Sequence, residues 1–240
     1  MFLIQCKKGE FTCDNGGCLD LKQRCNNLFE CSDGSDEDNC EPLWIDKDNY
    51  RKTFPPVSGK EKTEITVAAE INAVTNIDEM AMTFRGDIKL SLQWRDSRIM
   101  LRDLQSAGTF LNKYWMDKIW LPPLILSNTV GNMPILRDES IVVKIIKQGT
   151  HFHNDIIDVH EGMLFRGSEN DIQLDGQYET TFKCLFELQR FPFDTQNCTI
   201  NLKIPDEIRN YTILKPKDLH YTGIWFYILN PLSDITSNTI

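Results

Sequence analysis

The sequence contains no apolar stretch long enough to cross a membrane. Its longest unbroken apolar run is IWFYIL, residues 224–229, whereas a membrane helix needs about 20 such residues. The opening MFLI is too short for a secretory signal and has no basic segment ahead of it. We therefore expect either a piece of a longer membrane protein or a chain exported by a signal outside this sequence.

Positive charge and catalytic motifs are also scarce. Lys and Arg number 26 against 35 Asp and Glu, which gives a net charge of −9. An acidic surface repels the phosphate backbone, so we expect no nucleic-acid partner. The motifs G-x-S-x-G, H-E-x-x-H, the P-loop and G-x-G-x-x-G are missing. We expect no enzyme.

The eight cysteines are unevenly distributed. Six lie between residues 6 and 40, and the remaining two are Cys184 and Cys198. An even count with this local density is typical of an oxidising compartment. The glycosylation sequons at Asn197 and Asn210 agree with an extracellular location. Composition changes near Glu41, so the sequence predicts three segments: a module over 1–41, a linker with a first short element over 42–62, and a large domain over 63–240.

The N-terminal module is too small to fold on apolar burial alone, and such modules need disulfides or a metal. Its segment ECSDGSDEDNC, residues 30–40, places five acids within nine positions. Carboxylates this close repel one another unless a cation lies among them, and an oxygen-rich loop containing glycine suits Ca²⁺. Zinc is the less favoured metal because paired C-x2-C motifs are absent. A solvated acidic turn is the remaining alternative.

The segment CKKGEFTCDNGGCLDLKQRCNNLFECSDGSDEDNC, residues 6–40, resembles a low-density-lipoprotein receptor class A repeat. The resemblance rests on F-x-C at Phe11–Cys13 and on the closing C-x-D-x-S-D-E-x-x-C. It implies three disulfides: Cys6–Cys18, Cys13–Cys31 and Cys25–Cys40.

The same resemblance implies a calcium cage. Its ligands would be the side chains of Asn26, Glu30, Asp36 and Glu37 and the backbone carbonyls of Gln23 and Leu28. The family usually has Asp where this chain has Asn26 and Glu30, which removes one charge and lengthens one arm. The partner-gripping Trp of the family is replaced by Gln23, so a structural or docking role for residues 1–41 competes with capture of an extracellular protein.

The large domain is dominated by period-two alternation of apolar and polar residues. One face collects Ile65, Val67, Ala69, Ile71 and Ala73; three further strands align Ile88–Trp94, Phe182–Leu188 and Cys198–Ile204 in the same way. Such strands, separated by turns and without long helical patterns, predict an all-β, immunoglobulin-like antiparallel β-sandwich. A short helix is expected before Thr63.

The segment CLFELQRFPFDTQNC, residues 184–198, places Cys184 and Cys198 on inward positions of adjacent strands. A bridge between them would close a loop of thirteen residues and contribute about 3 kcal/mol. This C-x13-C loop around F-P-F-D resembles the signature of Cys-loop (pentameric) ligand-gated ion channels. WRDSRI at 94–99, KIWLPPLILSN at 118–128 and LHYTG at 219–223 extend the resemblance over about residues 42–240.

The channel resemblance implies a ring of five homologous subunits, with a small-molecule transmitter bound between neighbours. The disulfide loop would couple that ligand to a transmembrane pore through Phe191, Pro192, Phe193 and Asp194. Three positions that carry aromatic rings in many members are Lys89, Ser127 and Pro205 here, so an amine held by cation–π attraction is disfavoured. Lys89 with Arg209 suits a carboxylate, and a neighbouring subunit that carries the principal face is a further alternative.

Three functions compete at this point. The preferred one is the extracellular part of a neurotransmitter-gated channel subunit, truncated before the ligand-covering loop and the pore, at the outer face of the plasma membrane, with Ca²⁺ in its N-terminal module. The second is a secreted, pore-less binding protein of the same fold. The third is an adhesion or scaffolding protein that recruits partners through residues 1–41.

Overall fold

A computed structural model describes residues 6–7, 9–38, 40–57, 61–131, 141–152, 163–190, 193, 196–220 and 224–229. Within them the chain is built almost entirely of strands. These are β1 (Glu10–Thr12), β2 (Cys18–Asp20), β3 (Leu43–Ile45), β4 (Thr63–Asp78), β5 (Thr83–Trp94), β6 (Ile99–Arg102), β7 (Thr109–Leu111), β8 (Ile125–Leu126), β9 (Val142–Ile146), β10 (Leu164–Arg166), β11 (Asp171–Lys183), β12 (Cys198–Lys203), β13 (Thr212–His220) and β14 (Ile224–Leu229). The helices are short: η1 (Leu21–Gln23), α1 (Lys113–Met116) and η2 (Leu188–Arg190).

The strands form four sheets, ordered β1-β2, β10-β6-β3, β13-β4-β5-β11-β9-β7 and β14-β12-β8. The chain divides into two compact units. The first comprises Met1–Arg51, Arg95–Asp117 and Lys144–Ile172, and the second comprises Lys52–Trp94, Lys118–Val143 and Gln173–Ile240. The all-β sandwich predicted from alternation is confirmed, although two pairs, β12–β14 and β13–β4, are parallel. Among the described residues no helix is long and apolar enough to span a membrane.

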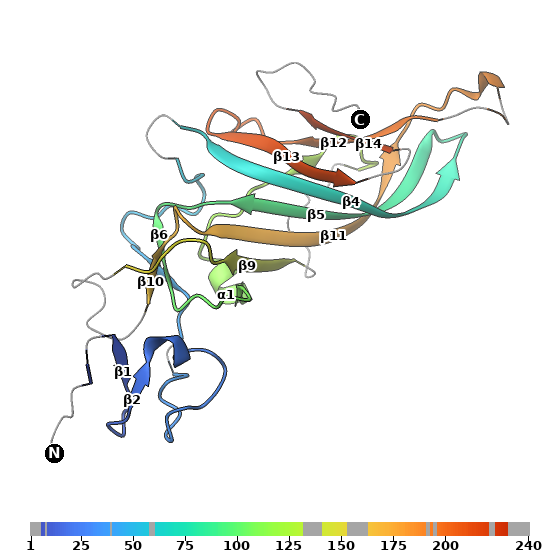
Figure 1. The fold of residues 1–240 in the computed structure, drawn as a ribbon. Coiled ribbons are helices and arrows are strands. Elements are labelled where there is room, and N and C mark those ends of the chain that lie inside the picture. Colours follow the sequence, from blue (N-terminus) through green and yellow to red (C-terminus); the bar gives the residue numbers. More distant parts are fainter. Residues whose placement is uncertain are drawn as a thin grey trace. The chain divides into compact units, whose positions relative to one another are not determined.

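The second unit contains the long β4–β5 hairpin, whose two strands and their neighbour β13 are prominent in Figure 1. Alternation buries Ile88, Leu90, Leu92 and Trp94 of β5, each at most 2% exposed. In β4 the first three positions of the predicted face are buried, but Ile71 is only half-buried and Ala73 is exposed. The reason is a register shift between Ile71 and Ala73, because a bulge of this kind moves the following side chains to the other face.

Aromatic pairs fill the core of the second unit. Phe84 stacks on Phe182 with ring centroids 5.3 Å apart, and Trp94 meets Trp120 edge-on at 6.1 Å. The predicted inward row of β12 is confirmed, since Cys198, Ile200, Leu202 and Ile204 are all buried. The row expected over 182–188 is not continuous: β11 ends at Lys183, and Leu188 begins η2 with 37% of its surface exposed.

The linker segment contains strand β3 and turns, and none of its described residues, 42–57 and 61–62, lies in the expected short helix. β3 pairs with β6, with Trp44 opposite Met100. The turn after β3 brings Tyr50 to Asp96, the second conserved-type position of WRDSRI in the sense of its W-x-D-x-R spacing, with a 3.0 Å bond from the Tyr50 hydroxyl to Oδ2.

Asp96 is the buried ionic centre of the first unit. Its carboxylate is fully buried and accepts bonds from Nε and Nη2 of Arg98, both at 2.8 Å. The Arg98 guanidinium also lies 4.4 Å from the centroid of the Tyr50 ring. Burial opposes the charge on Arg98, but the bonds to Asp96 raise the pKa of Arg98 above its usual value. Gly167 packs so closely here that a Cβ would lie 2.1 Å from the Asp96 carbonyl oxygen.

Replacing Asp96 by Ala should destabilise the protein by about 3 kcal/mol, because Arg98 would keep a half-buried charge without its partner. The measurement is the free energy of unfolding from denaturant titration. Glu179→Ala serves as the control, since it breaks an ion pair with Arg85 in which both side chains are about half exposed; its cost should stay within about 1 kcal/mol. Equal effects of the two substitutions would contradict a structural role for Asp96.

Candidate functional site

Four disulfides are present, and they are the pairs that the two resemblances imply. In the N-terminal module they join Cys6 to Cys18, Cys13 to Cys31 and Cys25 to Cys40. The apolar core of this module consists only of Phe11, Leu21, Cys13 and Cys31, with Leu19 and Met163 packed against it. A core this small makes the disulfides the main source of order in the module.

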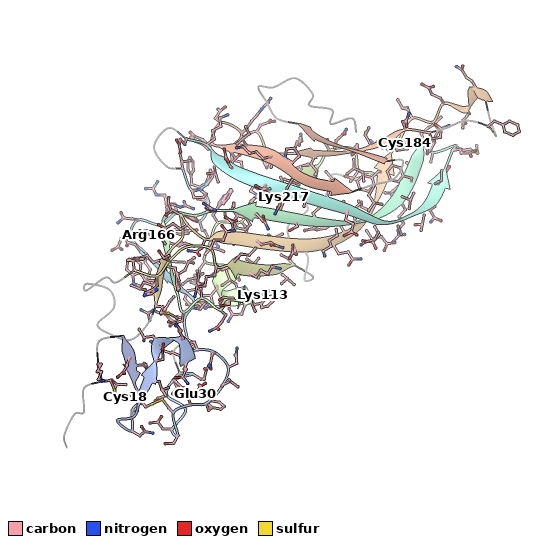
Figure 2. The ribbon with its side chains drawn as sticks, in the orientation of Figure 1. Cys18, Glu30, Lys113, Arg166, Cys184 and Lys217 are labelled. Carbon is pink, nitrogen blue, oxygen red and sulfur yellow. A yellow bond between two sulfur atoms is a disulfide. The ribbon has the colours of Figure 1, made fainter. Side chains whose placement is uncertain are left out.

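The disulfides hold three acidic side chains together near the labelled Glu30 in Figure 2. One carboxylate oxygen from each of Glu30, Asp36 and Glu37 lies within 4.8 Å of the others. Asp36 is fully buried. Its Oδ1 and the Oε2 of Glu30 are buried and accept no hydrogen bond from the described residues. Buried carboxylate oxygens without a donor are costly, and a bound cation would satisfy them.

Backbone donors shape the cluster. Oε1 of Glu37 accepts from the backbone N–H groups of Asn26 at 2.7 Å and Asn27 at 3.0 Å. Oδ2 of Asp36 accepts from the Glu30 N–H at 2.8 Å. Burial alone would raise the pKa of Asp36, but backbone N–H groups of Glu30 and Cys31 bond its carboxylate and hold the pKa below its usual value. Asp36 is therefore a carboxylate at neutral pH, as a cation site requires.

The remaining members of the expected cage are placed as follows. Asn26 donates Nδ2 to Oε1 of Glu30 at 3.0 Å, while its Oδ1 accepts from the Leu28 N–H at 2.9 Å. The Gln23 side chain instead caps η1, where its Oε1 accepts from Asp20 N–H at 3.3 Å. Neither arrangement engages the carbonyl oxygen of Gln23 or Leu28 with the acidic cluster. Three of the four proposed side-chain ligands are therefore together, and Asn26 contacts the cluster through its nitrogen.

The disulfide loop lies at the end of β11, where Figure 2 labels Cys184. Cys184 and Cys198 are bridged with Cα atoms 5.3 Å apart. The Cys184 N–H donates to the Met82 carbonyl at 2.9 Å, so the loop begins against the turn of the β4–β5 hairpin. Of the expected coupling residues, Phe191, Pro192 and Asp194 lie outside the described residues, and Phe193 is 91% exposed.

The sequence reasoning missed an apolar surface beside this loop. Met80 is 97% exposed, Leu185 is 85% exposed and Ile77 is 63% exposed. Together with Phe193 these four residues are called the apolar tip below. Large exposed apolar side chains that gather at one place indicate contact with another apolar surface. The signal in the sequence was the excess of apolar residues over NIDEMAM, 76–82, where alternation ends.

The three expected ligand-pocket positions are all accessible to some degree. Lys89 and Ser127 are exposed and Pro205 is half-buried. Among the described residues they form no hydrogen bond, ion pair or ring contact with one another. Ser127 donates its N–H to the Asn201 carbonyl at 2.9 Å, and Arg209, the suggested helper of Lys89, pairs with Asp206 at 3.5 Å. Both sequon residues, Asn197 and Asn210, are exposed.

Known proteins agree with these two parts. The low-density lipoprotein receptor domain class A model matches residues 4–40, and the neurotransmitter-gated ion-channel ligand binding domain model matches residues 44–206. The larger part thus defines a ligand-binding domain of receptor type. The chain belongs to the neurotransmitter-gated ion-channel ligand-binding domain family, which is not a family of enzymes. A vitellogenin receptor of Solenopsis invicta is 44% identical over 50 residues, which cover 21% of this chain and 3% of that receptor.

The acidic cluster should respond to pH in a defined direction. Because folding lowers the pKa of Asp36, its contribution to stability is present above its unfolded pKa of about 3.9 and is lost as the pH falls through the lower folded value. Amide exchange with chelator present should show the protection factor of the Glu30 N–H decreasing below about pH 4. Asp36→Asn should remove that decrease. A protection factor unchanged down to pH 2 in the parent chain would contradict the assignment.

Proposed function

We propose that the chain is the extracellular part of a neurotransmitter-gated channel subunit at the outer face of the plasma membrane. The observation that carries this proposal is the apolar tip, formed by Ile77, Met80, Leu185 and Phe193 around the Cys184–Cys198 bridge. A domain that only bound ligand in solution would have no use for these side chains in water. A membrane-embedded pore domain would offer them an apolar surface.

The tip is also built to transmit movement. The bridge ties the start of the loop to β12, and the Met82 carbonyl ties it to the β4–β5 hairpin. The Phe186 N–H additionally contacts the Met82 sulfur at 3.5 Å. A displacement of β11 or of the hairpin would therefore move the tip as one piece. Two connected contacts with the pore are more effective for coupling than a single tethered loop.

The ligand proposed for the boundary between subunits is a small molecule, bound where five homologous copies meet. Lys89 places a cation where many relatives have an aromatic ring, and a cation repels an amine. The three substituted positions, Lys89, Ser127 and Pro205, therefore favour an anionic ligand or a heteromeric ring whose other subunits supply the rings.

Expression of the complete reading frame tests the function. We expect apolar segments of about 20 residues after position 240 and ligand-evoked currents in voltage-clamped cells to which candidate anions and amines are applied. A reading frame that ends without such segments, with the protein recovered from the medium, would replace this proposal by the secreted binding protein. Loss of partner capture on deletion of residues 1–41, with no current for any ligand, would favour adhesion.

Substitution of the tip should separate binding from gating. Phe193→Ser in the complete channel should leave ligand affinity of the domain unchanged and should raise the half-maximal activating concentration several-fold, because an apolar contact worth about 1–2 kcal/mol is lost from the coupling surface. Currents and ligand binding on the same cells provide the measurement. Val130→Ser, at a residue that is 52% exposed elsewhere on the second unit, is the matched control. Equal shifts in both variants would refute the coupling role.

We further propose that the acidic cluster binds Ca²⁺. Glu30, Asp36 and Glu37 supply hard oxygen ligands, and two of their buried oxygens accept no bond from the described residues. A hard divalent cation with six to eight oxygen ligands matches this donor set. Asn26 would join if its amide turned its oxygen inward, and the carbonyls of Gln23 and Leu28 remain the proposed backbone ligands. The ion would act structurally by neutralising the cluster.

Calorimetry should detect one Ca²⁺ per chain, and Glu37→Gln should weaken binding at least about tenfold because it removes a charged ligand. Asp38→Asn is the control, since Asp38 is an exposed neighbour outside the cluster. Chelation should lower the thermal stability of the module in the parent chain and leave Glu37→Gln less affected. A control variant that loses calcium as strongly as Glu37→Gln would show nonspecific attraction to negative charge.

A further inference from the structure

A cavity of about 380 Å³ opens in the first unit, beside the N-terminal module and outside every site considered so far. The module contributes one wall through residues between Cys25 and Pro42. The other wall comes from residues 102–115, which include the end of β6, strand β7 and helix α1. Its volume lies near the lower end of the range for small-molecule sites, about 300–1,000 Å³.

Hydrogen bonds of the main chain give this cavity a fixed frame. Nε2 of Gln105 donates to the Cys25 carbonyl at 2.6 Å, which joins the two walls. The Gln105 N–H is in turn bonded to the Thr109 hydroxyl at 3.0 Å. Below them Arg102 N–H donates to the Pro42 carbonyl at 3.0 Å. The walls are therefore held apart by specific bonds at both sides, and the space between them is part of the fold.

Opposite charges line the cavity without satisfying each other. Arg102 lies on the sandwich side and Glu41 on the module side. Within the described part of the chain, neither the Arg102 guanidinium nor the Glu41 carboxylate takes part in an ion pair or a side-chain hydrogen bond. Asp103 is engaged differently, because its Oδ1 accepts from the Met163 N–H at 2.8 Å. Two charges that share a cavity but do not meet call for a ligand with a charge at each end.

The cavity also has an aromatic side. Phe110 is 66% exposed, and Trp115 is half-buried with its ring edge-on to Tyr114 at 5.1 Å. Asn112 caps α1 by accepting from the Trp115 N–H at 3.2 Å, which fixes the start of that turn. Aromatic rings beside unpaired charges suit a ligand with an apolar body and polar ends.

A metal ion is the poorer match. Among the described residues, Glu41 does not belong to any group of acidic, cysteine or histidine side chains close enough to share one ion. A larger organic ion can reach separated charges, whereas a bare cation cannot. We propose that this cavity binds a small zwitterion with an apolar side chain, the chemistry of a free α-amino acid. Its carboxylate would meet Arg102, its ammonium would meet Glu41 and Glu37, and its side chain would lie against Phe110 and Trp115.

The test is an NMR titration of the whole 240-residue chain in calcium with L-phenylalanine. The indole N–H of Trp115, identified by its loss in Trp115→Phe, should shift and saturate at millimolar concentrations. Phenethylamine lacks the carboxylate and 3-phenylpropionate lacks the ammonium; each should bind roughly tenfold more weakly, because one charge-assisted contact is lost. Arg102→Gln should reduce phenylalanine binding by a similar factor, and the more exposed Glu41→Gln should reduce it several-fold.

Matched variants keep the outcome specific. Arg51→Gln and Glu70→Gln change exposed residues that do not line the cavity, and they should bind phenylalanine like the parent. Thermal unfolding of every variant checks that the fold is retained. Absence of a saturable Trp115 shift would overturn the proposal, as would equal affinity for phenylalanine and phenethylamine, or an equal loss in the control variants. Because binding is measured on the chain itself, failure here would leave the channel proposal unaffected.

Discussion

Repulsion among three carboxylates held within 4.8 Å of one another is the constraint on which the N-terminal module depends. Three disulfides oppose that repulsion covalently, and backbone N–H groups of residues 26, 27 and 30 oppose it electrostatically. The apolar core of the module is too small to do so. The position of Cys25, and with it the bond to Gln105, follows from the same arrangement, since the Cys25 N–H is bonded to the Asp36 carbonyl.

The sandwich follows a different logic, in which alternation supplies most of the stability. Its inward rows on β5 and β12 are buried to within a few percent of exposure. The exception is the far end of β4 and the loop after β11, where apolar side chains turn outward. That exception coincides with the register shift after Ile71 and with the disulfide. Departures from a regular pattern that cluster in this way commonly mark function.

The two parts differ in how far their sequences predict them. Spacing of cysteines and acids is local, so the module, its acidic cluster and the disulfide loop could be inferred from short motifs. Alternation also predicts β5 and β12, but a bulge adds one residue without any signal in composition, which is why Ala73 was misplaced. Long-range contacts are harder still. Tyr50 meets Asp96 across 46 positions, and the cavity combines segments around residues 25–42 and 102–115. No local pattern announces such a combination.

Glu37 lines the cavity and also belongs to the acidic cluster. Two binding events that share one charged group are thermodynamically linked, and the linkage is reciprocal. A cation in the cluster would withdraw the negative charge of Glu37 from an ammonium group in the cavity, so each occupant would weaken the other by the same factor. The concentration of calcium outside the cell would then set how readily the neighbouring cavity fills.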